Sequence, residues 1–239
     1  MGFYRGPKLY NDGLVLALEA GSNRSYPGSG TVWKDLSGYG NNGTLANSPT
    51  HEGNHFSFDG TNDHVELDQN GASAASNVAH TGYGNFTGAY NDAYTFEVII
   101  RTTDSGGNSI FGQPIISDLS SGIWGALSMR SGKFSFALYD SSWKYVESTS
   151  DINDGVFHHC VVVHHADETV DIYIDGVQEQ QGVTRLIRPT SRYFKMNALM
   201  EGYNAAYHDG ELSTVRVYDQ ALTQDQVVQN YNAFKGRLV

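Results

Sequence analysis

The sequence predicts an all-β protein built from antiparallel strands, and three observations carry this prediction. Apolar side chains alternate with polar ones in most of the apolar segments, which is the period-two pattern of a strand with one face on a core. Turn dipeptides that tolerate positive φ separate several of these segments. The segments follow one another at about 8–12 residues, a spacing that is typical of a sandwich or a barrel.

Length and composition describe an acidic globular chain. Of its 239 residues, 15 are Lys or Arg and 26 are Asp or Glu, which gives a net charge of −11. This charge argues against binding to nucleic acid or anionic membranes, because their phosphate groups would be repelled. No stretch approaches the roughly 20 apolar residues that span a bilayer, and residues 1–10 lack the apolar core of a secretory signal peptide. The single cysteine, Cys160, excludes an intramolecular disulfide.

Three segments show the strand pattern most clearly. Residues 94–101, 133–139 and 169–175 alternate apolar and polar side chains over their whole length. In an antiparallel sheet this alternation is typical of a half-buried strand. We therefore expect each segment to place one face on the core.

Tight turns are predicted between successive strands. The turn dipeptides are Ser131-Gly132, Asp175-Gly176 and Asp59-Gly60. Each joins a residue that tolerates positive φ to a glycine, which is the signature of a two-residue hairpin loop. We therefore expect a β-hairpin at each of these positions.

One segment near the C-terminus breaks the strand pattern. Residues 223–235 place apolar side chains at i, i+4 and i+7, which predicts a helix. This stripe consists of Val227, Tyr231 and Phe234. Thr223 and Gln226 form a capping box. Leu222 staples the helix entry, and Gly236 predicts the C-terminal stop. We expect this one short C-terminal helix to cover an open edge or end of the sandwich.

The chain shows no internal repeat and no interdomain linker. We therefore expect one domain over residues 12–239, preceded by an N-terminal arm over residues 1–11. Residues 71–92 are small, polar and rich in glycine and asparagine, which predicts a long loop at the rim of the fold.

Four segments resemble a known family and follow its order along the chain. Residues 12–45, 56–67, 157–176 and 213–237 resemble laminin-G-like jelly-roll domains of the concanavalin A-like superfamily. The opening DLSG and NNGT pieces and the closing QNYNAFKGR resemble versions found as structural proteins of bacteriophage virions. The resemblance implies a two-sheet antiparallel jelly-roll sandwich that binds at its loop rim or concave face. Lectins, glycosidases and pure interaction modules all use this fold.

The resemblance also implies which residues a glycosidase of this fold would need. Its glycosidases carry alternating carboxylates on one strand, so that one attacks and one protonates on the same face. The only Glu-x-Asp here is Glu66-Leu67-Asp68, and Gln69 and Asn70 follow it, so the third acid is missing. We therefore expect no enzymatic activity. A glycosidase with an unrecognised acid pair is the remaining alternative.

Two acidic turns are candidates for calcium, the one cofactor that the sequence suggests. The candidate ligands are Asp35, Asn41 and Asn42 in the first turn and Asp59 and Asp63 in the second, with Ser37 and Asn62 beside them. Calcium takes six to eight oxygen ligands, many of them from loops. The alternative is that Asx-turns simply stabilise these loops. Ser213-Thr214 stands where related domains often have Asp-Glu, which removes a carboxylate from an inherited site.

The histidine-rich segment 157–165 predicts packing rather than metal binding. Alternation sets His158, Cys160 and His164 on one face, and His159 and His165 on the other. Neighbours at i and i+2 could supply two zinc ligands, so zinc binding is the alternative. The resemblance implies packing instead, because members of this family commonly have an aromatic-His-His entry to this strand. We therefore expect structural histidines and a buried thiol.

Candidate contacts to ligands and partners come from aromatic and basic side chains. The rings that could stack on a sugar are Trp33, Tyr39, Trp124, Trp143 and Tyr207. The candidates for partner docking are Phe3, Tyr4 and Arg5 in the arm, and Arg185, Arg188 and Arg192 in the one basic patch. The alternatives are that the arm lies across its own sandwich and that the arginines pair with the chain's own acids.

Together these features predict a non-enzymatic protein displayed on a phage particle, as capsid decoration, fibre or tail component. It would be made in the host cytoplasm and lie on the virion surface. Its expected partners are other virion proteins, host-surface glycans and further copies of itself, with no nucleic acid and no membrane insertion. The alternative from another class is a lectin whose main role is calcium-assisted carbohydrate binding.

Overall fold

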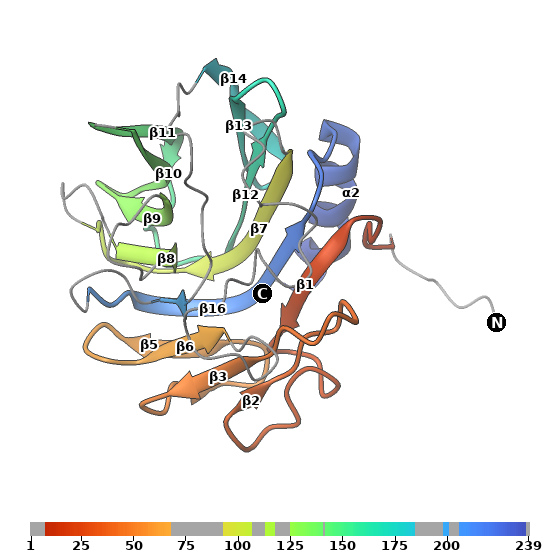
Figure 1. Ribbon diagram of the computed structural model, residues 1–239. Coiled ribbons are helices and arrows are strands. Elements are labelled where there is room, and N and C mark those ends of the chain that lie inside the picture. The colour runs from red at the N-terminus through yellow and green to blue at the C-terminus, as the bar shows by residue number, and fades with distance from the viewer. Residues whose placement is uncertain are drawn as a thin grey trace.

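The computed structural model describes residues 8–67, 93–106, 113–117, 125–140, 142–184, 198–200 and 206–237. In this part of the chain, two eight-stranded antiparallel sheets lie face to face, and the helix α2 lies outside them (Figure 1). This confirms the prediction of a two-sheet antiparallel sandwich with one short C-terminal helix. Among the described residues, no helix has the length and apolar character needed to cross a bilayer.

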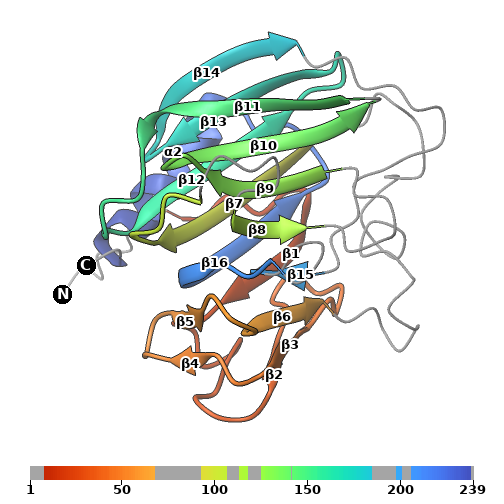
Figure 2. The same cartoon turned by 90° about the vertical axis from the view of Figure 1, so that its left-hand side faces the viewer.

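Sheet A has β1 paired to β16 beside a path of seven strands. In spatial order the path is β14 (Val177–Thr184), β13 (Thr169–Ile174), β12 (His158–His164), β7 (Tyr94–Arg101), β16 (Asp209–Tyr218), β5 (Phe56–Asp59) and β4 (Thr50–His51), and β1 spans Leu14–Glu19. Strands from both ends of the sequence therefore meet at the centre of this sheet, as Figure 2 shows.

Sheet B packs against sheet A and is formed mostly by the middle of the chain. Its spatial order is β11 (Ser142–Asp151), β10 (Lys133–Asp140), β9 (Gly125–Arg130), β8 (Gln113–Ser117), β15 (Ala198–Leu199), β6 (His64–Leu67), β3 (Gly43–Ala46) and β2 (Val32–Trp33). The core between the sheets is aromatic and aliphatic. Phe96 of β7 faces Phe136 of β10 across it, with ring centroids 6.4 Å apart.

The central strands of sheet A are buried on both faces, which corrects the expectation of half-buried strands there. In β7, Val98 and Ile100 face sheet B, while Glu97 and Ile99 face the other way and are still at most 1% exposed. The strand β13 is likewise buried from Val170 to Ile174. The reason is that a second layer, described next, covers the outer face of this sheet.

This second layer is α2 (Gln224–Phe234) and the segment that precedes β1. Val227 and Leu222 pack on Val161, Val163 and Tyr173 of the sheet. Figure 1 shows α2 on the side of sheet A that faces away from sheet B. The helix thus covers a sheet face, not the edge or end that the sequence suggested. Its apolar stripe needs a broad apolar surface, and the outward side chains of β12 and β13 supply one.

Both ends of α2 can be compared with the prediction. The capping box is confirmed, because Thr223 Oγ1 accepts from the N–H of Gln226 and the Gln226 side chain accepts from the N–H of Thr223 at 2.8 Å. The predicted stop at Gly236 is wrong. The chain continues there as a 3₁₀ turn, η1 (Lys235–Arg237), and Gly236 does not take the positive φ of a C-terminal cap.

Two of the three predicted hairpins are confirmed. Ser131-Gly132 joins β9 to β10 with φ values of 52° and 80°, and Asp175-Gly176 joins β13 to β14 with φ values of 51° and 77°. The third prediction is wrong. Asp59-Gly60 connects β5 in sheet A to β6 in sheet B, so this turn crosses between the layers. The dipeptide specifies a tight turn but not the partner of the strand that follows.

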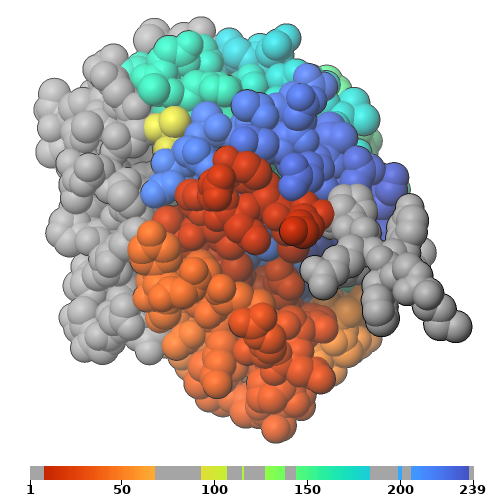
Figure 3. Space-filling model, turned by 90° about the vertical axis from the view of Figure 1, so that its right-hand side faces the viewer, coloured from red at the N-terminus to blue at the C-terminus, as the bar shows by residue number. Residues whose placement is uncertain are grey.

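The described end of the N-terminal arm lies on the chain's own sandwich. The carbonyl of Lys8 accepts from Gln229 of α2 at 2.6 Å, and the N–H of Tyr10 donates to Asn230 at 2.8 Å. Figure 3 shows the N-terminal segment in red beside the blue C-terminal segment on this face. Residues 1–7, with Phe3, Tyr4 and Arg5, and the predicted rim loop 71–92 lie outside the described residues.

Candidate functional site

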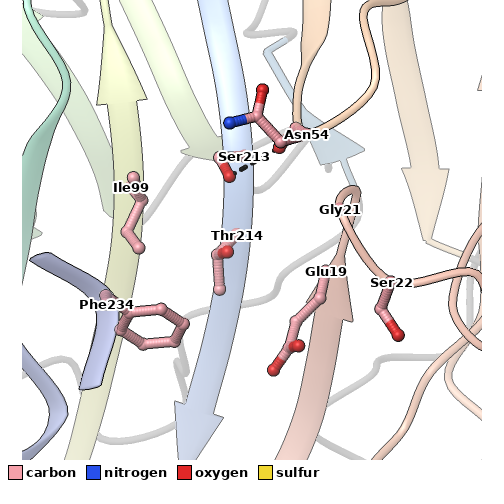
Figure 4. A pocket seen from close by; sticks show the side chains of 8 residues that line it. All are labelled: Glu19, Gly21, Ser22, Asn54, Ile99, Ser213, Thr214 and Phe234. Carbon is pink, nitrogen blue, oxygen red and sulfur yellow. Dashed lines mark hydrogen bonds between the residues drawn. The ribbon is translucent and has the colours of Figure 1, made fainter. Parts of the chain in front are cut away.

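A pocket of about 550 Å³ opens on the outer face of sheet A, next to the C-terminal end of α2 (Figure 4). Its lining residues are Glu19, Gly21, Ser22, Asn54, Ile99, Ser213, Thr214 and Phe234. They come from β1, β7, β16, α2 and two loops. The site is therefore assembled from segments that lie far apart in the sequence.

The floor of the pocket is a single row of side chains that runs across three strands. Glu19 of β1 is paired with Thr214 of β16, and Thr214 is paired with Ile99 of β7. Directly paired residues point to the same face of a sheet. Figure 4 shows Glu19 and Ile99 on either side of Thr214 in this way. We call these three residues the open row.

The walls of the pocket are fixed by local contacts. Ser213 Oγ donates to the carbonyl of Asn54 at 2.7 Å and holds that loop against β16. On another wall, the N–H of Ser22 donates to the carbonyl of Glu19 at 3.1 Å, which closes a turn directly after β1. The ring of Phe234, from the last turn of α2, adds an aromatic surface.

Glu19 is the only ionisable residue in the lining of this pocket. Its Oε1 accepts from Arg216 Nη1 at 3.2 Å. Within the described part of the chain, no donor contacts Oε2. The pocket therefore offers one carboxylate with spare acceptor capacity, three hydroxyls and an amide, together with the apolar side chains of Ile99 and Phe234.

A sealed polar cluster lies directly beside the open row on the same face. It consists of Glu97, His159, Arg216, Tyr218 and Asn230, each at most 2% exposed. Glu97 Oε1 lies 2.6 Å from His159 Nε2, and Glu97 Oε2 accepts from Asn230 Nδ2 at 3.0 Å and from the Tyr218 hydroxyl at 3.1 Å. Arg216 Nε lies 3.6 Å from Glu97 and donates to Tyr218 at 2.9 Å. This sealed cluster connects α2 and the sheet.

The electrostatics of the sealed cluster keep Glu97 ionised. Burial raises the pKa of its carboxyl, but contacts with His159, Arg216 and Tyr218 outweigh burial and hold the pKa below its usual value. Arg216 also donates to the carbonyl of Tyr10 at 3.0 Å and to Asn11 at 2.7 Å. Because these groups are at most 2% exposed and bond mainly to one another, the cluster is structural.

The first predicted calcium turn is occupied by its own hydrogen bonds. Asp35 accepts from the N–H groups of Ala17, Ser37 and Asn41 at 2.9–3.0 Å and from the Ser37 hydroxyl at 2.6 Å. The side chain of Asn42 accepts from the N–H of Asp35 at 3.0 Å. These contacts match the Asx-turn alternative and leave few lone pairs on these side chains for a cation.

The second predicted calcium turn has a similar geometry. Asp59 Oδ1 accepts from the N–H groups of Thr61, Asn62 and Asp63 at 2.9–3.2 Å, and these bonds lower the pKa of its carboxyl. Burial, and then the charge of Asp59, raise the pKa of Asp63. Across the described ranges, no three His, Cys, Asp or Glu side chains form a group that could hold a metal ion.

The aromatic residues that were predicted to stack on a sugar differ in their exposure. Trp33 is fully buried and packs on Phe56, with ring centroids 4.9 Å apart, so the prediction of an exposed stacking ring is wrong there. Tyr39 is 49% exposed but does not line the pocket. Tyr207 is half-buried beside the ring of His64. Trp124 and the side chain of Trp143 lie outside the described residues, as do Arg185, Arg188 and Arg192.

The histidine-rich segment has the packing role that was predicted. Cys160 is buried in the core between the sheets, and burial raises the pKa of its thiol. His158 lies 2.8 Å from Asp175 and 3.1 Å from Asp154, and chiefly the bond to Asp175 raises the pKa of its ring. His159 belongs to the sealed cluster described above.

Sequence reasoning missed most of the pocket. Glu19, Ser22, Asn54 and Phe234 were not singled out as binding residues, and Ser213-Thr214 was noted only as a lost carboxylate pair. One usable signal existed, since Glu19 is a polar residue at the end of an apolar strand. That signal does not identify the strands and the helix that complete the site.

Comparison with known proteins supports the fold. The sequence model of a family described as the concanavalin A-like lectin/glucanases superfamily matches residues 59–228. A solved Trypanosoma rangeli sialidase in complex with sialic acid is 14% identical, with a TM-score of 0.66 over 95% of this chain and 34% of that chain. The receptor-binding domain of botulinum neurotoxin D is 15% identical, with a TM-score of 0.66 over 95% of this chain and 53% of that chain. At these identities the two structures show a shared fold alone. No curated protein matches the sequence.

Proposed function

The chain belongs to the concanavalin A-like lectin/glucanases superfamily, and from this premise we propose that it is a non-enzymatic saccharide-binding module. The observation that carries the proposal is the pocket on the outer face of sheet A. Its lining combines an aromatic and an aliphatic side chain with a carboxylate, hydroxyls and an amide. Its volume lies within the range of small-molecule sites.

The chemistry of the pocket suits a sugar ring. A sugar presents C–H groups on its faces and hydroxyls around its edge, so its site needs apolar contact and hydrogen-bonding partners together. Phe234 and Ile99 line the pocket with apolar side chains that are at most 2% exposed, and Thr214, Ser22 and Glu19 line it with polar groups. The pocket therefore has a complementary partner for each part of such a ligand.

The absence of enzymatic activity is supported by the number of acids in the pocket. Glycoside hydrolysis uses two carboxyl groups that are about 5–9.5 Å apart. The lining contributes only Glu19, and the neighbouring Glu97 is fully buried beneath α2. A single carboxylate can accept a hydrogen bond from a sugar hydroxyl, but it cannot serve as both the acid and the nucleophile. A screen for hydrolysis of polysaccharides tests this part, and any turnover that Glu19→Gln abolishes would contradict it.

The biological setting that we propose is the surface of a phage particle. The sequence resemblance to virion structural proteins supports this, together with a strongly acidic chain that is unsuited to packaging nucleic acid. The module would contact other virion proteins and further copies of itself, and would present the pocket to host-surface glycans. Mass spectrometry of purified particles tests this setting, and absence of the protein from them rejects it.

Saccharide binding is tested with a glycan array and isosteric variants. We expect wild-type protein to bind glycans and Thr214→Val to bind the same glycans about 2–10-fold more weakly, because one hydrogen bond is lost. Thr103→Val changes an exposed threonine outside the pocket and is the matched control. Binding that persists in chelator would separate this site from a calcium-dependent lectin. Failure of the wild type to bind any glycan, or equal losses in the two variants, would reject the proposal.

A further inference from the structure

The lining of the pocket carries a carboxylate and no cationic side chain. Arg216 lies behind the pocket between two carboxylates, at 3.2 Å from Glu19 and 3.6 Å from Glu97. One guanidinium therefore faces two carboxylates. No Lys, Arg or His lines the pocket itself.

His159 contacts the other carboxylate of this group, because its Nε2 lies 2.6 Å from Glu97 Oε1. Arg216 contacts Glu19 through Oε1. Oε2 of Glu19 therefore presents a carboxylate oxygen to the pocket with no donor among the described residues.

We infer that the pocket selects a hexose that carries an amino group, admits neutral hexoses more weakly and rejects acidic ones, with Glu19 as the residue that determines this order. The inference rests on the proposed saccharide-binding function and adds charge selectivity to it. An ammonium group would donate to Oε2 of Glu19 in a charge-assisted bond. A uronic or other acidic sugar would bring a second negative charge beside Glu19 and would find no cation in the lining.

The net charge of the chain also favours binding of a cationic sugar, but it does not favour one site over another. A net charge of −11 attracts any cation, so attraction alone does not identify the pocket. The test must therefore distinguish the effect of Glu19 from the effect of the net charge. Glu66→Gln does so, because it removes the same charge from a residue whose side chain is 68% exposed and does not line the pocket.

The experiment is an NMR titration of the full chain at pH 6 with three monosaccharides of one scaffold: glucosamine, glucose and glucuronate. The galacto counterparts form a second series. Amide shifts at Ser22 and Thr214 report occupancy of the pocket itself. We expect glucosamine to bind about fivefold more tightly than glucose, and glucuronate to bind more weakly than glucose. High salt should narrow these differences.

The variants complete the test. Glu19→Gln should bind glucosamine and glucose equally, while Glu66→Gln should keep the wild-type order. Arg216 keeps Glu97, Tyr10 and Asn11 as partners in Glu19→Gln, so this variant should remain folded, and its thermal unfolding checks that. Equal binding of the three sugars by the wild type, or a preference for glucuronate, would overturn the inference and leave the proposed function intact. If none of the sugars shifts the pocket amides, both are overturned.

Discussion

Two adjacent groups of polar side chains on the outer face of sheet A differ in one respect, their cover. In the sealed cluster, Glu97 and Arg216 lie beneath α2, and Asn230 of the helix completes their hydrogen bonds. In the open row, Glu19 and Thr214 lie beyond the end of the helix and line a pocket. The same sheet face therefore carries a structural network and a candidate binding site a few ångströms apart.

This comparison shows what separates a structural polar group from one that can bind. Both regions contain a buried or half-buried glutamate in contact with Arg216. The carboxylate of Glu97 is saturated by protein donors on both oxygens, whereas Glu19 has one oxygen free of them within the described chain. Acceptor capacity that the fold leaves unused is available to a ligand. Residue type alone does not distinguish the two glutamates.

The largest expected effect comes from Glu97→Gln, which breaks the sealed cluster. Removal of one partner from a buried ion pair costs about 3–5 kcal/mol, because Arg216 then keeps only the partly exposed Glu19 as a carboxylate partner. Glu19→Gln should cost about 1 kcal/mol or less, since that pair is partly solvated. Urea denaturation of both variants measures the contrast. Equal destabilisation by the two substitutions would contradict the distinction between the regions.

The next largest effect is expected from Asn230→Ala, which removes the contact between α2 and the sealed cluster. Its side chain donates to Glu97 and Tyr218 and accepts from the N–H of Tyr10, so we expect a loss of about 2 kcal/mol. Trypsin should also cleave faster after Lys8, because the N-terminal segment loses an anchor. Asn232→Ala on the same helix is the control. Similar cleavage rates in both variants would show that Asn230 does not hold the N-terminal segment against α2.

A smaller effect is expected at the start of α2. Thr223→Ala removes the capping-box hydroxyl and should cost about 1 kcal/mol of unfolding free energy. Thr223→Ser keeps the hydroxyl and should retain most of the stability. Saccharide binding should change little in either variant, because the pocket lies at the other end of the helix. A stronger loss of binding than of stability would show that the whole helix shapes the pocket.

The smallest effect is a pH dependence of the stability that arises from His158, the first residue of β12. The pKa of His158 is raised, so its pairing with Asp175 stabilises the fold fully below the ordinary histidine value and is lost as the pH rises through the folded value. Burial raises the pKa of Asp175, but bonds from His158 and His159 hold it below its usual value, so its contribution is lost in acid. The stability difference between wild type and His158→Gln should therefore be largest near pH 5–6 and shrink toward pH 8. A constant difference across this range would reject the pairing.

Local patterns in the sequence were sufficient for local structure. The capping box at Thr223 and Gln226 and the turns at Ser131-Gly132 and Asp175-Gly176 were predicted because each depends on residues close together in the chain. Period-two alternation assigned the histidines to the two faces of their strand, and the family resemblance implied their packing role. In the same way, the apolar stripe of α2 predicted a buried face but not the surface that buries it.

Long-range pairing could not be predicted in the same way. Asp59-Gly60 is a tight turn in either case, but only the pairing of β5 with β16 and of β6 with β3 makes it a crossover. Trp33 was predicted as an exposed ring because its two-residue strand gives no periodicity. The structure buries it against Phe56 from the other sheet.

The sequence by itself determined the fold class, the strands near residues 94–101, 133–139 and 169–175, two of the hairpin turns and the beginning of the helix. These features depend on backbone preferences and side-chain periodicities that act over a few residues. The tertiary structure alone decided which polar groups are sealed and which remain open. Glu19 and Arg216 are 197 residues apart in the chain, and they meet only because β1 and β16 pair in one sheet. Whether a neighbouring polar group is buried depends on where the eleven-residue helix α2 ends on that sheet. Packing between segments that are distant in the chain sets the position of this helix end.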